Sequence, residues 1–363
     1  MIGATRAPPA RQRSLVGGFV HWLHKNIFDG GLNIALALVS FVFLVTVIPP
    51  AWRWLITDSQ TAPADFDSCK AAGGACWAYL QAKWRLILFG TYTYSEQWRP
   101  ALAIGLFIGA AALSAWPVVW AARARRLCML GLWIIVLLAV AVLMPGGAFG
   151  LATVEHRLWA GLPLTMGLAI IGCLSAFVIA VLLALGRRSE MPMIRWICIG
   201  YIEFVRGVPL VGLLFLATIL FPLLVPPDVD IDKLVRAQIA FVMFFAAYMA
   251  EAIRGGLQSI PNGQYAAAEA LDLGYWRMQW HVVLPQALQR AVPSLVNVFI
   301  AAFKDTSLVT IVSMMDLLGT ANAAKADPKW WGLYIESYLF IAVIYFAFCA
   351  ALSRVSKRWE QRA

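Results

Sequence analysis

Charged residues are scarce in this chain. Asp, Glu, Lys and Arg make up 13% of the 363 residues, whereas hydrophobic residues make up 61%. This composition excludes an ordinary soluble domain and is typical of a polytopic membrane protein.

Two kinds of motif are also missing. The sequence has no G-x-x-x-x-G-K-[ST] phosphate loop, so the chain has no visible means of hydrolysing ATP. It has no internal repeat of long period either. We therefore expect neither an ATP-hydrolysing enzyme nor a second copy of any long segment within this one chain.

Cysteine and histidine are few. Cys69 and Cys76 share one loop, residues 53–99, which contains no histidine and no further cysteine, so a metal site is not expected there. On the oxidising side of a membrane the two thiols could form a disulfide or stay free. Both alternatives are open at this point.

Apolar runs without charge are what the sequence has in quantity. About 20 apolar residues can cross a bilayer as a helix. Full-length runs occupy residues 30–52, 100–122, 127–154, 158–186 and 207–227. Shorter or interrupted runs, long enough with their flanks, occupy residues 237–250, 291–303 and 337–353. The predicted fold class is all-α, with about eight transmembrane helices.

Basic residues set the orientation. With the N-terminus in the cytoplasm, most of the 29 Lys and Arg residues fall on the cytoplasmic side, so we expect both termini there. On that side the basic residues face anionic lipid, which explains the net charge of +10 without a nucleic-acid partner. Because the first apolar run has full span length, we expect a signal anchor after a tail of residues 1–29, not a cleavable signal peptide.

One polar stretch, residues 251–307, interrupts the apolar runs. Its Gly255-Gly256 pair predicts that the helix carrying Glu251 ends near Arg254. Short helices are expected over residues 264–273 and 275–283, the second ending before a proline. Such short helices have no core of their own, so they should rest on membrane helices or enter a partner's groove.

This stretch resembles the cytoplasmic coupling loop of inner-membrane permease subunits of ABC importers, which reads Glu-Ala-Ala-x3-Gly-x9-Ile-x-Leu-Pro. Here the pattern, preceded by Gly263 and Gln264, falls on Ala266, Ala267, Ala268, Asp272, Val282, Leu284 and Pro285. Ala266 thus replaces the family's Glu, and Asp272 replaces its Gly. Glu269, on the helix face of Ala266, could restore the acidic contact, and Gly274 could restore the turn.

Further motifs narrow the resemblance to permeases for polar and general L-amino acids. They occupy residues 184–189, 203–210, 247–256 and 304–308, in the family's order. The resemblance implies a five-helix ABC importer core over residues 151–363, with a coupling loop over 254–291. Residues 30–150 look like the three-helix extension of general L-amino acid permeases, with a periplasmic loop over 53–99.

The resemblance implies a transport subunit of the bacterial inner membrane that moves L-amino acids by ATP-driven alternating access. The expected partners are an ABC ATPase dimer, a second permease subunit that is homologous or identical, a periplasmic amino acid-binding protein and membrane lipid. ATP and Mg would be bound by the ATPase, and no cofactor by this chain.

Ionisable side chains inside an apolar run are costly unless they pair or line an aqueous path. Lys304 and Asp305 could line the path of a zwitterionic amino acid, which needs one group of each sign, or could pair with Glu336 or Arg206 of other helices. The hydroxyls that follow could bind a carboxylate or bond back to their own helix. The candidate translocation path is Lys304, Asp305, Thr306 and Ser307.

Glu251 and Glu203 are each followed by an arginine three positions later. This spacing predicts local ion pairs between Glu251 and Arg254 and between Glu203 and Arg206.

Two other classes of function fit part of the sequence. An ion-coupled secondary amino acid transporter would also place charges in the membrane, but it leaves the polar stretch unexplained. A membrane scaffold without transport activity would use Lys304 and Asp305 only for packing.

Overall fold

The computed structural model describes residues 28 and 30–360, with gaps at 62–63, 121 and 227–230. All named elements of these residues are helical, which confirms the predicted fold class. They form two compact units, the first ending at Ala78 and the second beginning at Tyr79. The predicted tail, residues 1–29, lies outside the described residues except for Phe28.

The first unit contains α2, Gly31–Trp52, its π-helical continuation η1, Arg53–Thr57, and the short helix α3, Phe66–Ala72. α3 begins with a capping box, in which the Asp65 carboxylate accepts from the Ser68 backbone N–H and the Ser68 hydroxyl accepts from the Asp65 N–H. Cys69 of α3 is bonded to Cys76, with 5.4 Å between their Cα atoms. Of the two alternatives for these thiols, the structure contains the disulfide.

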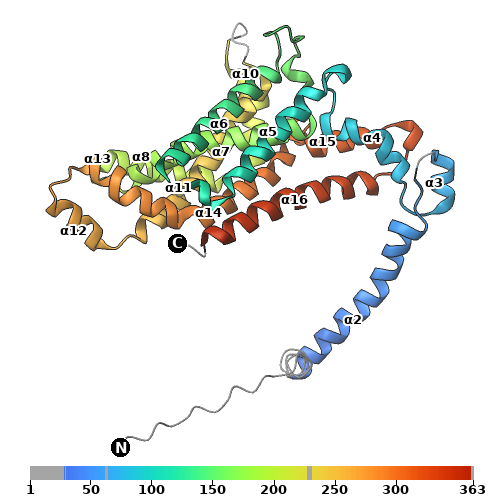
Figure 1. Cartoon of the computed structure of the whole chain (residues 1–363), viewed down its shortest axis with the longest axis horizontal. Coiled ribbons are helices and arrows are strands. Elements are labelled where there is room, and N and C mark those ends of the chain that lie inside the picture. Colours follow the sequence, from blue (N-terminus) through green and yellow to red (C-terminus); the bar gives the residue numbers. More distant parts are fainter. Residues whose placement is uncertain (1–27, 29, 62–63, 121, 227–230, 361–363) are drawn as a thin grey trace, which may run out of the picture. The chain divides into compact units, whose positions relative to one another are not determined.

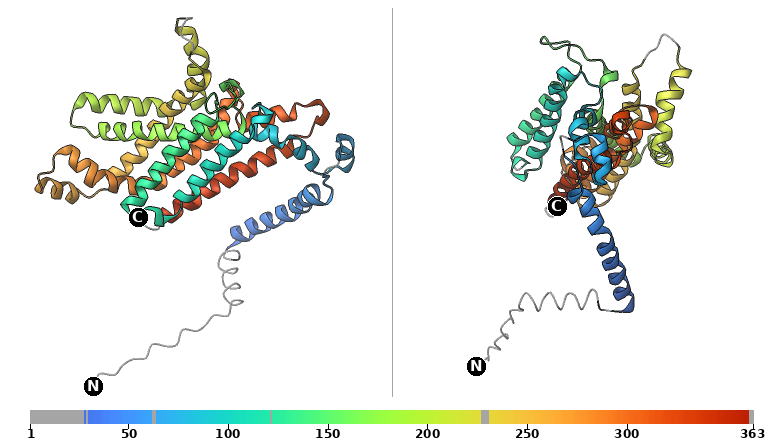
Figure 2. Two further views of the ribbon diagram at one scale, coloured as in Figure 1. Left: turned by 45° about the horizontal axis from the view of Figure 1, so that its top comes forward. Right: turned by 90° about the vertical axis from the view of Figure 1, so that its right-hand side faces the viewer.

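The second unit is a helical bundle (Figures 1 and 2). Its longer helices are α4 (Trp77–Phe89, from Tyr79 on), α5 (Trp98–Ser114), α6 (Arg123–Leu143), α7 (Gly161–Arg187), α8 (Pro192–Gly207), α11 (Lys233–Gln258), α12 (Asn262–Ala270), α14 (Leu284–Asp305), α15 (Leu317–Lys325) and α16 (Ile335–Glu360). Shorter helical segments are η2 (Tyr94–Glu96), η3 (Pro117–Trp120), η4 (His156–Leu158), α9 (Leu210–Phe215), η5 (Leu216–Leu220), α10 (Phe221–Leu224), α13 (Tyr275–Met278), η6 (Gln279–Val283), η7 (Thr306–Val312) and η8 (Pro328–Trp330).

Six of the described helical runs are long and apolar enough to cross a membrane, or seven if α8 with α9 and α10 counts as one bent span. That pair is bent by 100° at a break next to Pro209, whose ring has no backbone N–H to continue the helix. The remaining predicted span, residues 100–122, contains α5, but this 17-residue helix ends at Ser114 and is not among the six. Each charge-free run therefore contains an apolar helix, but six or seven of these helices meet the length and composition of a span, where the sequence predicted about eight.

α7 and α11 form the centre of the bundle. Ala176, Ala180 and Ala184 recur at every fourth residue of α7, so they share one face, and all three are fully buried. A Cβ at Gly172 would lie 2.9 Å from the ring of Phe241 of α11. Small residues on this face allow the two helices to approach closely.

The two ends of the bundle differ. α12 and α13 project from one end, and α15 lies at the other (Figures 1 and 2). α5 and α6 belong to this second unit with the helices of the predicted core. The boundary between the two compact units, after Ala78, therefore differs from the predicted boundary between the extension and the core, after residue 150.

Candidate functional site

The coupling loop, residues 254–291, begins inside α11. This helix does not end near Arg254 as predicted but continues to Gln258. Gly256 is buried, and a Cβ there would lie 2.3 Å from the backbone oxygen of Ala287 of α14. The second glycine of the pair is therefore needed for close packing between α11 and α14, and it does not break the helix.

α12 ends in a Schellman motif. The Leu273 N–H donates to the Ala268 carbonyl at 3.1 Å, and the Asp272 N–H donates to the Glu269 carbonyl at 2.9 Å. Asp272 itself has the left-handed conformation that this motif requires, with φ 54°. The expectation that Gly274 restores the turn is wrong, because Gly274 has φ −58° and ψ 154°, which other residues adopt readily.

The second short helix does not stop before Pro285. α13, η6 and α14 follow one another without a break, and the helical run extends from Tyr275 to Val312. Pro285 lies in the first turn of α14, directly after the π-helical turn η6. Inside a continuous helix, proline removes one hydrogen bond and its ring crowds the preceding turn, and the wider π-helical turn just before Pro285 accommodates both effects.

The residues of the coupling motif fall into two groups. Ala268 and Leu284 are buried with 2% exposure and belong to the main hydrophobic core. Gly263, Gln264, Ala266, Ala267 and Glu269 are exposed. Large apolar side chains beside them are exposed as well: Leu271, Tyr275, Trp276 and Trp280. The loop thus has a packed side and a free side, and a partner can bind the free side.

Four hydrogen bonds from three side chains hold the loop in place. Arg188, just after α7, donates from Nη1 to the Leu257 carbonyl and to the Tyr265 hydroxyl, both at 3.0 Å. The Gln286 amide donates to the Gln264 side chain at 3.0 Å. Further along, the Arg290 guanidinium donates to the Ser259 carbonyl.

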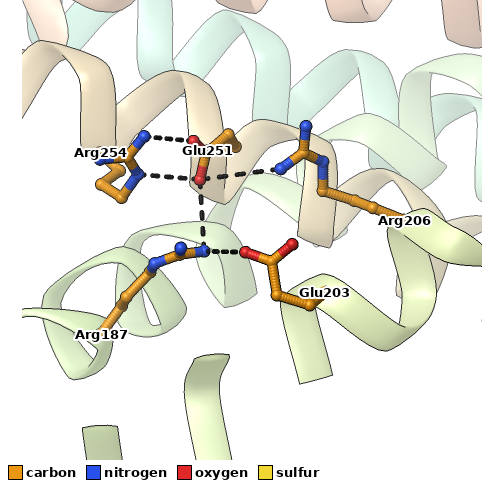
Figure 3. Close-up of polar contacts among 5 residues, drawn as sticks. All are labelled: Arg187, Glu203, Arg206, Glu251 and Arg254. Atoms are coloured by element: carbon orange, nitrogen blue, oxygen red, sulfur yellow. Dashed lines mark hydrogen bonds and ion pairs between the residues drawn. The ribbon is translucent and has the colours of Figure 1, made fainter. Parts of the chain in front are cut away.

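An ion cluster lies next to the start of the loop (Figure 3). At its centre is Glu251 of α11, whose carboxylate accepts from Nε of Arg254 at 2.9 Å and also from its Nη2. The same carboxylate lies 3.5 Å from Nη1 of Arg187 and 4.0 Å from Nη1 of Arg206. The predicted pair of Glu251 with Arg254 is confirmed, and two further arginines join it.

The second predicted local pair is wrong. Glu203 of α8 lies 2.9 Å from Nη1 of Arg187 of α7, whereas the ion pair of Arg206 is with Glu251 (Figure 3). The cluster therefore joins α7, α8 and α11 at one point. Its members are only partly buried, so each contact contributes less than it would in a dry core.

Lys304 and Asp305 end α14, and the helix then tightens into the 3-10 segment η7. Lys304 is exposed and Asp305 is half-buried, and the ion pairs found in the described part of the chain include neither. Thr306 is buried and donates back to the Phe303 carbonyl at 2.8 Å, as the helical alternative predicted. Ser307 is half-buried. The role of these residues in a translocation path stays a prediction.

Sequence reasoning did not identify Arg187, Arg188 and Tyr265 as parts of the site. The two arginines lie in the motif over residues 184–189, so a signal was present, but their partners are 16 or more positions away. Contacts across that distance depend on how the helices pack.

The model of the family described as binding-protein-dependent transport system inner membrane component matches residues 176–363, which include every residue of the loop and the cluster. The chain is also 41% identical over 342 residues to the inner membrane amino-acid ABC transporter permease protein YhdY of Escherichia coli, covering 94% of this chain and 92% of that one. It is 34% identical over 412 residues to the glutamate/glutamine/aspartate/asparagine transport system permease protein BztC of Rhodobacter capsulatus, covering 95% and 94%.

Among solved structures, the chain resembles the crystal structure of an amino acid ABC transporter with histidines. The TM-score is 0.50 at 28% identity, over 56% of this chain and 92% of that one. Both permease relatives align with nearly the whole chain, so the segment before residue 176 is shared with them. The chain belongs to the family of binding-protein-dependent transport system inner membrane components.

Proposed function

We propose that this chain is the permease subunit of a binding-protein-dependent ABC importer that carries L-amino acids across the bacterial inner membrane by ATP-driven alternating access. The observation that carries the proposal is the unbroken helical run from Tyr275 to Val312. One part of this run belongs to the coupling loop, and a later part carries Lys304 and Asp305. A force applied to the loop therefore reaches the candidate path through one helix.

The partners follow from this mechanism. An ABC ATPase dimer binds the exposed side of the loop and carries ATP and Mg, because this chain has no phosphate loop. A second permease subunit, homologous or identical, completes the path, and a periplasmic binding protein delivers the amino acid. Both termini lie in the cytoplasm, as the distribution of basic residues favours.

In this cycle, closure of the ATPases pushes α12 and tilts α11 and α14 together, because their backbones are in close contact at Gly256. The path then opens towards the binding protein, and ATP hydrolysis returns it to the inward-open state. Both relatives are named as amino acid permeases, which supports L-amino acids as the substrate class. The chain performs no covalent chemistry.

Affinity purification from native membranes, followed by mass spectrometry and uptake assays, tests the proposal. We expect an ATPase and a second permease to co-purify, and uptake to stop when ATP is depleted at a constant ion gradient. A chain that purifies alone and transports amino acids in liposomes under an ion gradient would instead be a secondary transporter.

A further inference from the structure

Two consecutive arginines at the end of α7 contact different parts of the molecule. Arg187 lies between two carboxylates, with Nη1 2.9 Å from Glu203 of α8 and 3.5 Å from Glu251 of α11 (Figure 3). Arg188 instead contacts the coupling loop, at the Tyr265 hydroxyl. The end of α7 is thus in contact with the ion cluster and with α12 at the same time.

The contact of Arg188 joins the end of α7 to α12. Its guanidinium donates to the Tyr265 hydroxyl and to the Leu257 carbonyl, and it also lies 5.5 Å from the centre of the Tyr265 ring. The other polar side-chain contact of α12, between Gln264 and Gln286, stays within the continuous segment of α11 to α14. Among the described residues, the hydrogen bond from Arg188 is therefore the only one that ties α12 to a helix outside that segment.

Arg187 joins the same end of α7 to α8 and α11. Glu203 and Glu251 lie on different helices, and Arg187 is the residue whose guanidinium contacts both. Because Arg187 and Arg188 are adjacent on one backbone, a displacement of one moves the other. A shift of α12 that pulls on Arg188 thus changes the distance between Arg187 and the two carboxylates.

We propose that Arg187 and Arg188 are positioning residues that transmit the movement of α12 to the ion cluster of α7, α8 and α11. The inference rests on the proposed function, since it needs an ATPase that moves α12. In one state both sets of contacts hold the three helix ends together. When α12 moves, Arg188 draws the end of α7 with it, the bridge between Glu203 and Glu251 weakens, and the helices separate.

The test uses the complete complex in proteoliposomes and measures the amino acid taken up per ATP hydrolysed. Arg188→Ala removes both hydrogen bonds, and we expect the ratio to fall about fivefold. Tyr265→Phe removes only the hydroxyl and should lower the ratio about twofold. Arg195→Ala is the matched control, because Arg195 is an exposed arginine on the neighbouring helix α8, and its ratio should equal that of the unaltered complex.

A double-mutant cycle separates transmission from general damage. Once Arg188 is replaced, Tyr265→Phe should have no further effect on the ratio if the two residues act through one contact. An unchanged ratio in both single variants would overturn the inference while leaving the proposed function intact. If Arg188→Ala does not assemble, Tyr265→Phe decides alone. Absence of ATP-dependent uptake in the unaltered complex would contradict the proposed function itself.

Discussion

Arg254 lies one helical turn after Glu251 in α11 and donates to its carboxylate from two nitrogens, Nε at 2.9 Å and Nη2. This two-point contact fixes the orientation of the carboxylate, because a planar guanidinium and a carboxylate match as a pair. The oxygen that faces α7 and α8 is thereby held where Arg187 and Arg206 approach it. A local pair within one helix thus positions the contact between three helices.

Glu251→Gln should destabilise the protein more than Glu203→Gln. The first change leaves three arginines without their central anion, at a cost of about 1–3 kcal/mol in the free energy of unfolding. The second affects one pair whose carboxylate is 55% exposed, and should cost about 0.5 kcal/mol. Thermal unfolding of the detergent-purified variants measures both, and equal losses would show that Glu251 is not the centre of the cluster.

Substitution of the two neighbouring glycines by alanine should have opposite effects. A Cβ at Gly256 would overlap the Ala287 carbonyl, so Gly256→Ala should lower the free energy of unfolding by about 1–3 kcal/mol. Gly255 has no atom within 4 Å of an added Cβ and lies in a helix, so Gly255→Ala should raise it by up to about 1 kcal/mol. A lower free energy of unfolding in Gly255→Ala would contradict this prediction and favour the sequence-based interpretation of the glycine pair as a helix breaker.

Asp272→Gly should stabilise the coupling loop. The Asp272 side chain adds steric cost in the left-handed conformation, and glycine removes it for a gain of about 0.5–1 kcal/mol. We expect uptake to stay the same or rise. Gly274→Ala is the control, because φ at Gly274 is negative and an added Cβ meets no atom within 4 Å. A large loss of uptake in Asp272→Gly would show that its carboxylate has a role of its own.

The sequence predicted the features that depend on local spacing. Charge-free runs located the apolar helices because the free energy of membrane insertion depends on composition over one segment. The pairing of Glu251 with Arg254 was predictable because three positions in a helix bring side chains together. The short helix before Asp272 was predicted as well, within two or three residues of its ends.

Features that depend on neighbouring helices were not predictable. Gly256 reads as a breaker in the sequence, but its role is set by α14, whose backbone is in contact with it. The partner of Glu203 could not be found by spacing, because Arg187 belongs to another helix. The choice between Asp272 and Gly274 as the left-handed residue depended on which carbonyls the chain reaches after α12.

Lys304→Ala and Asp305→Ala should each lower amino acid uptake about tenfold or more without releasing the ATPase. If these residues line the proposed path, each change removes one charged partner of a zwitterionic substrate, and a hydrogen bond to a charged group is worth about 1.5–3 kcal/mol. Arg195→Ala is the control, because Arg195 is an exposed charged residue of α8 outside the candidate path, and it should affect uptake little. Normal uptake in both charge variants would assign these residues to packing.

Asp316 begins α15 and is fully buried. Its carboxylate accepts from the Gly319 N–H at 2.9 Å, the Leu318 N–H at 3.2 Å and the hydroxyls of Thr310 and Tyr345. Burial raises the pKa of Asp316 above its ordinary value of 3.8, although these hydrogen bonds oppose the rise.

The raised pKa gives a prediction with a defined sign. Below pH 3.8 the side chain is neutral in the folded and unfolded chain, and its full contribution to stability is present. As pH rises through the folded pKa, this contribution is lost, because the folded chain then holds a buried charge. Asp316→Asn keeps an N-cap but cannot ionise, so its stability relative to the unaltered protein should increase as pH rises from about 4 to neutrality.

Asp316→Ala serves as the control for the cap itself. It removes the acceptors for two backbone N–H groups, so it should be about 1–2 kcal/mol less stable than Asp316→Asn at every pH, while both variants show the same pH trend relative to the unaltered protein. Unfolding of the three proteins in detergent over this pH range separates the two effects. A relative stability of Asp316→Asn that falls with rising pH would mean that the hydrogen bonds outweigh burial and that the carboxylate stabilises the fold as an anion.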